Sequence, residues 1–266
     1  MELELKKSTA SARIKSMLRV DLRRMFTSPL FYIMAGISLV MPILILVMTT
    51  MMDGTVTVNP QTKVETVMEG FDNVWQAISS TTAESGSMNM SLTSMCNMNL
   101  IFFMSAVLVC LFVGDDFRSG YAKNLFTVRA KKGDYIISKT LVLFLCGVIM
   151  LLAFFIGALL GGVIAGLSFE TTASVGEIAL CLLSKCLLMA VFIAIFLLMS
   201  VIGKQKVWLS MLLSFGVGML LFMMIPALTP LDATIINAIL CLSGGAIFSV
   251  GMGLIGKTVL DKTALV

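Results

Sequence analysis

Long apolar runs dominate this sequence and limit what it can fold into. Six stretches approach the ~20 mostly apolar residues that cross a bilayer as a helix: residues 30–52, 98–114, 140–167, 186–202, 207–226 and 234–256. Only 13% of the 266 residues are charged, which is about half the share found in soluble domains. The sequence therefore predicts a single all-α polytopic membrane domain over residues 1–266, with six transmembrane helices.

The distribution of lysine and arginine predicts how these helices are oriented. Of the 19 basic residues, 17 lie in the N-terminal segment, the loop after the second run, the turn after the fourth run and the tail. The opposite loops carry only Lys63, together with eight acidic residues. Positive loops stay in the cytoplasm, so we expect both termini inside and a large outer loop at residues 53–97. Lys185 opens the fourth run, where we expect it to reach water at the outer boundary; the alternative is a buried functional lysine.

Two segments outside the apolar runs show helical periodicity. Residues 1–29 are a cytoplasmic segment in which apolar residues recur every three or four positions between arginines, which predicts an amphipathic helix in the headgroup layer. Ser28-Pro29 separates it from the first span. In the outer loop, the same spacing and a Thr62–Glu65 capping box predict a helix over residues 63–79 with Trp75 at the interface. The apolar residues of the first segment are Ile14, Met17, Leu18, Leu22 and Met25.

Several classes of chemistry are excluded by the residues that are present. The chain has no histidine and no CxxC pair among its six cysteines, so we expect no catalytic site, no metal site and no disulfide. Basic residues cluster beside apolar runs, which argues against nucleic acid as a partner. Gly251, Gly256, Lys257 and Thr258 fit the phosphate-binding pattern G-x-x-x-x-G-K-T. They lie within the last apolar run, where a helix would use their amides, and we reject a nucleotide site.

Glycines and one loop carry the remaining information. Gly157, Gly161, Gly162 and Gly166 give overlapping G-x-x-x-G spacings, which indicate close helix packing and would also suit a dimer seam. The loop at residues 115–139 begins with Asp115 at the end of the second span. Negative charge is unfavourable at a helix C-terminus, so a basic group must compensate, either Arg118 or a partner.

The same loop predicts a short amphipathic helix exposed to the cytosol. Leu125 and Phe126 lie among basic residues, Gly133 ends the stretch, and Asp134 caps the next span. A plain interfacial loop would explain the basic residues, but not the acidic pair or the apolar insert.

These residues resemble the membrane subunits of ABC type-two exporters. The family signature places an acidic residue, Arg and Gly after the second span, which Asp115, Asp116, Arg118 and Gly120 match. A second part, S-R-x-x-[RK]-x-x-Y-x-x-x-K, is matched by Arg129, Lys132, Tyr135 and Lys139. Size, span number, the amphipathic N-terminal helix and the large first outer loop agree with the family in outline.

The resemblance implies that residues 119–132 form a coupling helix that docks on a separate ATP-binding subunit. That subunit would hold ATP and magnesium, and this chain would hold no cofactor. The implied coupling residues are Asp115, Asp116, Arg118, Gly120, Lys123, Leu125, Phe126, Arg129, Lys132 and Tyr135.

The expected function is that of a permease subunit working as a dimer with a second copy or a paralogue. It would export a hydrophobic or amphipathic substrate (a peptide, lipid or drug) across a cell membrane, with a bacterial plasma membrane expected. The 22 methionines would give adaptable apolar walls to a substrate path whose residues the sequence does not identify. Two alternatives are a non-transporting membrane scaffold and an ion-coupled secondary transporter, which usually places ionisable groups near the middle of the bilayer.

Overall fold

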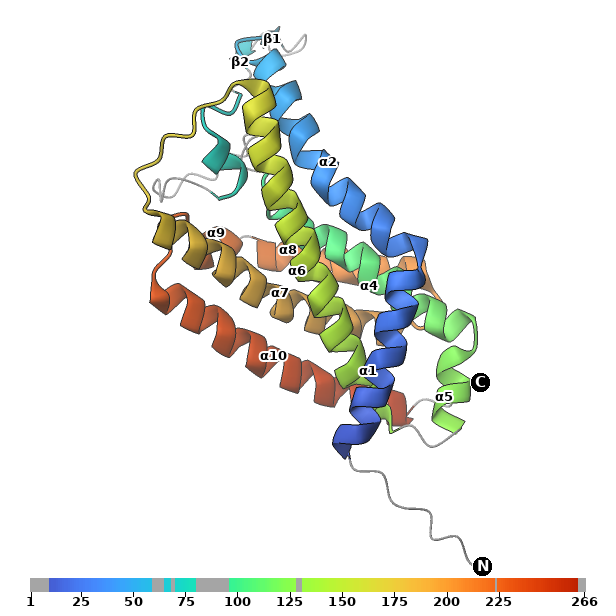
Figure 1. The fold of residues 1–266 in the computed structure, drawn as a ribbon. Helices are drawn as coiled ribbons and strands as arrows, with labels where there is room; N and C mark the ends of the chain where they lie inside the picture. Colours follow the sequence, from blue (N-terminus) through green and yellow to red (C-terminus); the bar gives the residue numbers. More distant parts are fainter. Residues whose placement is uncertain are drawn as a thin grey trace, which may run out of the picture.

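The computed structural model describes residues 10–58, 65–67, 70–79, 96–127, 131–222 and 224–262. Five of its helices are long and apolar enough to cross a membrane (Figure 1): α2 (Pro29–Met52), α4 (Leu100–Arg118), α6 (Lys132–Ala165), α7 (Val175–Gly203) and α10 (Ile235–Lys262). A shorter apolar helix, α8 (Val207–Phe222), occupies the position of the fifth predicted run. The other α-helices within the described ranges are α1 (Ala10–Thr27), α5 (Tyr121–Thr127) and α9 (Ile225–Leu228). The protein is an all-α polytopic membrane protein.

The predicted runs and the helices differ mainly at their polar ends. The largest difference is at α7, which begins at Val175 rather than near residue 186. Ser174 caps this helix: its hydroxyl accepts from the Glu177 amide, and the Glu177 carboxylate accepts from the Ser174 amide. This capping box starts the helix before its apolar run begins. Two other helices also extend past their predicted apolar runs: α6 begins at Lys132, and α10 continues to Lys262.

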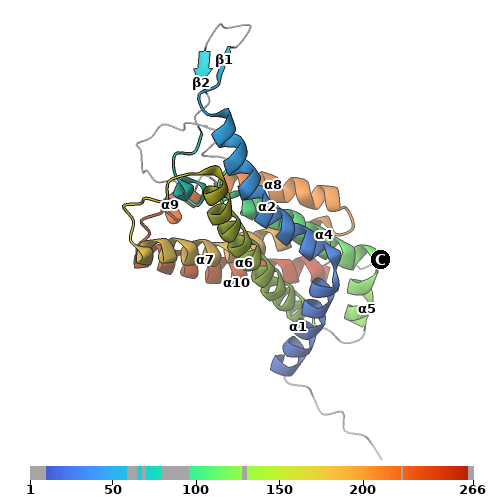
Figure 2. The ribbon, with the colours of Figure 1, turned by 45° about the horizontal axis from the view of Figure 1, so that its top comes forward.

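Helix α7 lies at the centre of the bundle. It contacts α4, α6, α8 and α10, and Figure 2 shows these helices gathered around it. Its aromatic side chains Phe192 and Phe196 are buried, and Phe192 packs against Phe102 of α4 with ring centroids 4.6 Å apart. The apolar faces that remain exposed lie mostly on α2, α6, α8 and α10, where lipid is the expected solvent.

The glycine spacings of α6 serve packing within the chain. A Cβ at Gly157 would lie 2.1 Å from the carbonyl oxygen of Leu39, and one at Gly161 would lie 2.8 Å from the Cα of Ile43. Helix α2 therefore packs directly on the α6 backbone along this stripe. The packing prediction is confirmed, and at these two positions the neighbour is α2 of the same chain.

The first helix packs on the bundle rather than only lying beside it. Helix α1 ends at Thr27, and the Ser28 hydroxyl accepts a hydrogen bond from the Leu30 amide (3.3 Å) at the start of α2. Met17 and Met25 are buried and α1 contacts α6. The apolar periodicity predicted the helix, but its apolar side packs on α6, whereas the sequence placed it in the lipid headgroup layer.

The predicted helix over residues 63–79 is not formed by the part of that range that the structure describes, residues 65–67 and 70–79. The described residues of the outer loop include two short antiparallel strands, β1 (Val56–Val58) and β2 (Glu65–Val67), and a 3-10 helix, η1 (Val74–Ala77). Glu65 pairs with Val58 in this hairpin, so it is not part of a capping box, and Thr62 lies outside the described residues. The indole of Trp75 donates a hydrogen bond to the carbonyl of Phe169 (3.0 Å), which joins η1 to the loop after α6.

Candidate functional site

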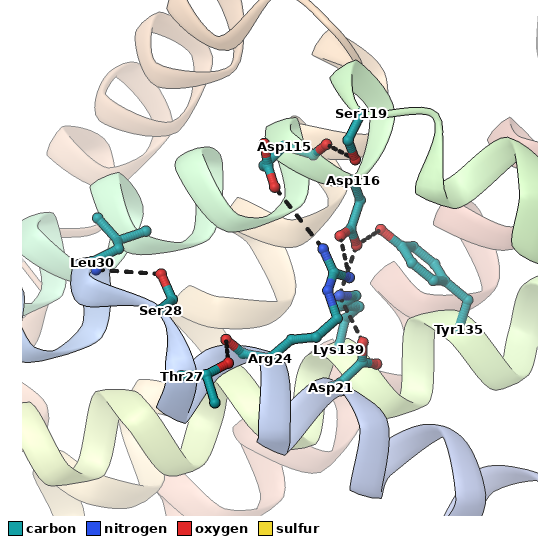
Figure 3. A network of polar contacts seen from close by, with 10 residues as sticks. All are labelled: Asp21, Arg24, Thr27, Ser28, Leu30, Asp115, Asp116, Ser119, Tyr135 and Lys139. Atoms are coloured by element: carbon teal, nitrogen blue, oxygen red, sulfur yellow. Dashed lines mark hydrogen bonds and ion pairs between the residues drawn. The ribbon is translucent and has the colours of Figure 1, made fainter.

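A buried ion network lies where α1 meets the C-terminal end of α4 and the start of α6 (Figure 3). The charge bias predicts this end of the bundle to be cytoplasmic. Asp21 and Arg24 come from α1, Asp116 from the last turn of α4, and Tyr135 and Lys139 from α6. The network therefore lies beside the start of α5, the short helix in the predicted coupling loop, where Arg24 and Lys139 face the ring of Tyr121.

Lys139 is the centre of the network. Its ammonium lies 2.7 Å from Asp116 Oδ2 and 2.9 Å from Asp21 Oδ1, and all three side chains are buried. It also lies 4.0 Å from the ring centroid of Phe112, a cation–π arrangement that is strengthened by the absence of water. Two carboxylates from different helices therefore face this one ammonium.

Arg24 closes the network from α1. Its guanidinium donates to Asp116 Oδ1 (2.7 Å) and stacks on the ring of Tyr121 with 3.9 Å between Cζ and the ring centroid. Burial alone would lower the pKa of Arg24, but the adjacent Asp116 carboxylate raises it above its ordinary value. Burial likewise raises the pKa of the Tyr121 hydroxyl. Both groups therefore keep their protons at physiological pH.

Hydrogen bonds from α6 complete the carboxylate shells. The Tyr135 hydroxyl donates to Asp116 Oδ2 (2.9 Å), and the Ser138 hydroxyl donates to Asp21 Oδ2 (2.6 Å). Two buried carboxylates, Asp21 and Asp116, thus face the two basic side chains Arg24 and Lys139. Buried charges are tolerated when they are paired and hydrogen-bonded in this way.

Helix α5 is attached to this network by its apolar side. Gly120 adopts a left-handed conformation (φ +74°) that turns the chain out of α4. Ala122 is buried, and the ring of Phe126 packs edge-on against Tyr135 with centroids 5.4 Å apart. Leu125 and Phe126, which are among the implied coupling residues, are both half-buried against the core of their own chain. Lys123 and Asn124 form the exposed side of α5.

The structure separates the predicted coupling residues into two groups. Asp116 and Tyr135 are internal, whereas the side chains of Asp115, Arg118 and Lys123 are exposed. Lys132 is bound to the end of α10, where its ammonium donates to the Leu260 carbonyl (2.7 Å) and lies 3.4 Å from Asp261. Arg129 lies outside the described residues.

Three local predictions in this loop need correction. Arg24 and Lys139 compensate the acidic pair, rather than Arg118, because α1 brings its cation to the buried Asp116. The short helix covers Tyr121–Thr127 rather than residues 119–132, and Gly133 lies inside α6. Asp134 does not cap α6: its carboxylate accepts from Arg13 Nε (2.9 Å), a second contact between α1 and α6.

Asp21 and Arg24 are the site residues that sequence reasoning missed. One signal was present: Met17, Asp21 and Met25 recur every four residues, so an acidic residue lies in the middle of the apolar stripe of α1. A carboxylate on the face that packs against protein requires a cation opposite.

A second buried charge lies at the other end of the bundle. Lys185 is fully buried, and its ammonium donates to Asn99 Oδ1 (2.7 Å) and to the Thr229 hydroxyl (3.1 Å). The expectation that it reaches water was wrong because α7 starts at Val175, ten residues before it. None of the carboxylates in the described part of the chain forms an ion pair with it.

The remaining motifs place no chemistry in the described residues. The G-x-x-x-x-G-K-T pattern lies within the continuous helix α10, and the Thr258 hydroxyl donates to the Leu254 carbonyl. No group of three or more Cys, Asp or Glu side chains in the described ranges is arranged to hold a metal ion.

Together, the apolar helices and the anchored loop helix define a polytopic membrane protein with a short helix at the end of the bundle that the charge bias predicts to be cytoplasmic. Comparison with protein families identifies it further: the profile of the ABC-2 family transporter proteins matches residues 22–221. The chain belongs to this family, and it is a membrane permease component of an ABC transporter, not itself catalytic. The match includes Arg24, Asp116 and Lys139 but ends before α10. Comparison with curated proteins and with solved structures finds no match to either.

Proposed function

We propose that this chain is a permease subunit of an ATP-driven exporter in a bacterial plasma membrane. It works with a second copy or a paralogue, and separate ATP-binding subunits hold ATP and magnesium. The substrate is a hydrophobic or amphipathic peptide, lipid or drug that leaves the cytoplasm. Membership of the ABC-2 family supports the permease role, and the resemblance of the coupling loop supports the outward direction.

The observation that carries this proposal is the attachment of α5. This helix is joined to α4 through Gly120, to α6 through Phe126 and Tyr135, and to α1 through Arg24 and Tyr121. A displacement of α5 by an ATPase would therefore move the ends of three helices together. In a two-state permease, an ATPase that binds one state more tightly shifts the population toward that state.

The contact with the ATPase is then polar. Lys123, Asn124 and Thr127 form the exposed side of α5, with Arg118 and Ser119 beside them. Asp116, Tyr135 and Phe126 act as positioning residues that hold α5 from within. In this arrangement Leu125 and Phe126 do not insert into a groove of the ATPase.

An ion-coupled secondary transporter is the second candidate, and Lys185 is the feature that favours it. An ionisable side chain buried inside the membrane region often marks an ion or proton path. The family match argues for the ATP-driven reading instead, and it leaves Lys185 the role of holding α7 to the start of α4. A scaffold without transport activity has no specific feature of the structure in its favour.

Affinity purification from native membranes tests the proposal. We expect an ATP-binding subunit to co-purify in stoichiometric amount, and the reconstituted complex to hydrolyse ATP and to transport in an ATP-dependent manner. Purification of the chain without any ATPase, combined with transport driven by an ion gradient, would establish the second candidate in its place.

A further inference from the structure

An apolar groove runs between α6 and α10, and α7 forms its floor. Its volume of about 580 Å³ lies within the ~300–1,000 Å³ typical of ligand sites. Apart from two hydroxyl residues, Thr140 and Ser249, the only polar lining residue is Lys257 at one end. A groove with an apolar length and one cationic end matches an amphiphile with an anionic head.

Small residues explain why the groove exists. A Cβ at Gly256 would lie 3.2 Å from Ile136, so α10 and α6 touch near their ends. A Cβ at Gly245 would lie 3.2 Å from Ala190, so α10 also touches α7. Between these two contacts, Ala246 and Gly253 leave the wall hollow, because neither carries a side chain long enough to fill it.

The cationic end of the groove has no internal counterion in the described ranges. Lys257 is exposed, and its Cδ would lie 3.8 Å from a Cβ at Gly133, so its stem passes over the start of α6. The neighbouring Lys132 is already engaged by Asp261 and the Leu260 carbonyl. Lys257 is thus available to an anion that arrives from the membrane surface.

We propose that this groove binds an anionic glycerophospholipid of the cytoplasmic leaflet. The phosphate lies against Lys257, and one acyl chain follows the groove toward Leu242. Helix α10 rises about 22 Å between these two residues, and one leaflet contributes about 15 Å of hydrocarbon, so the groove covers the full depth of a leaflet. Basic pockets between helices on the cytoplasmic side bind anionic lipid heads in this manner.

A second copy of the chain is the other occupant to consider. A two-fold axis along the membrane normal would pair this face with itself. Lys257 of each copy would then lie at the same depth and opposite its equivalent. The described residues that line the groove include no acidic side chain to neutralise the two facing lysines, so the lipid is the better occupant.

Native mass spectrometry of the purified chain, with the subunits that co-purify, measures this binding. The probes are phosphatidylglycerol and zwitterionic phosphatidylcholine. Lys257→Ala should lower phosphatidylglycerol affinity about fivefold, as expected for one surface cation, and leave phosphatidylcholine unchanged. Ala246→Phe fills the groove from an exposed position and should lower both affinities by about tenfold or more. Two controls outside the groove, Lys206→Ala and Ile247→Phe, should change neither.

Two results would overturn the proposal. The first is equal phosphatidylglycerol affinity in the wild-type chain, Lys257→Ala and Ala246→Phe. The second is a shift of Ala246→Phe from dimer to monomer with lipid binding unchanged, which would make this face an interface between copies. Because the readout is bound lipid, neither result depends on transport or ATP hydrolysis.

Discussion

Lys139 of α6 and Asp116 of α4 form an ion pair of 2.7 Å in which both side chains are fully buried. An isolated buried ion pair adds little to the free energy of unfolding, because the cost of removing two charges from water is about as large as their attraction. Here α1 adds Asp21 and Arg24, so each charge has more than one partner. As a result α1, which precedes the first span, is bound to the same groups that contact the start of α5.

Removing one carboxylate should destabilise this junction strongly. Asp116→Asn leaves Lys139 paired only with Asp21 and leaves Arg24 only the exposed Asp115 at 3.9 Å, and breaking a buried pair costs about 3–5 kcal/mol. Asp115→Asn is the matched control, since that side chain is 70% exposed and lies 3.9 Å from Arg24; we expect a loss below about 1 kcal/mol. Thermal unfolding in detergent compares the two, and equal losses would contradict the assignment of Asp116 as an internal residue.

The spans were predictable because lipid imposes a simple requirement. A run of apolar residues long enough to cross the bilayer must form a helix, since its backbone groups have no other partner. Helix ends are set by polar residues, and the predicted start of the fourth span did not take such residues into account. The Ser174–Glu177 capping box was visible in the sequence, and it would have placed Lys185 well inside α7.

The ion network was not predictable in the same way. Asp21 and Lys139 are far apart in the chain, and no local pattern links a residue of α1 to one of α6. Their contact follows from the packing of α1 on the bundle, which depends on tertiary shape. Conversely, Thr62 and Glu65 match a capping box, yet Glu65 is paired with Val58 in a hairpin. Local motifs predict ends of helices only where a helix forms.

Glycine packing between α2 and α6 gives a second prediction. In Gly157→Ala the new Cβ would lie 2.1 Å from the Leu39 carbonyl, so the two helices must separate, at a cost of about 1–3 kcal/mol. Gly36→Ala in α2 is the control, because a Cβ there meets nothing within 4 Å; we expect a neutral effect or a gain of up to about 1 kcal/mol. Thermal unfolding of both variants in the same detergent measures the difference, and a neutral Gly157→Ala would argue against the close packing.

The buried lysine of α7 provides the third prediction. Asn99→Leu removes an acceptor from Lys185, and the loss of a hydrogen bond to a charged group costs about 1.5–3 kcal/mol. Adding Lys185→Met should recover much of this loss, because no buried charge is then left without its partner. Denaturant or thermal unfolding of the single and double variants tests the coupling. A double variant less stable than Asn99→Leu alone would show that Lys185 is stabilised by other groups.

Cysteine labelling tests the orientation that the charge bias predicts. Thr171, between α6 and α7, and Lys131, before α6, are both exposed, and the positive-inside rule places them on opposite sides. In a Cys96→Ala background, Thr171→Cys should react with an impermeant maleimide in intact cells. Lys131→Cys should react only after the membrane is opened. The reverse pattern would invert the topology and would place α5 outside, away from any ATPase.

The exposed side of α5 gives the most specific prediction about function. Lys123 points away from the core, so a change there should leave the ion network and the fold intact. In Lys123→Glu, a reversed charge at the rim of the ATPase contact should weaken association about threefold to tenfold at low salt. The defect should shrink as salt screens the contact.

Lys206→Glu is the control for Lys123→Glu, because Lys206 is also exposed and lies on the same predicted side, in the turn between α7 and α8. Phe126→Ala separates docking from positioning. It removes the ring that packs on Tyr135, so it should loosen α5 and uncouple ATP hydrolysis from transport, while ATPase association keeps the salt dependence of the wild-type complex. Co-purification over a salt series, with ATPase and transport rates for each variant, distinguishes these effects. If Lys123→Glu and Lys206→Glu retain the ATPase equally at every salt concentration, the partner does not dock on the exposed side of α5.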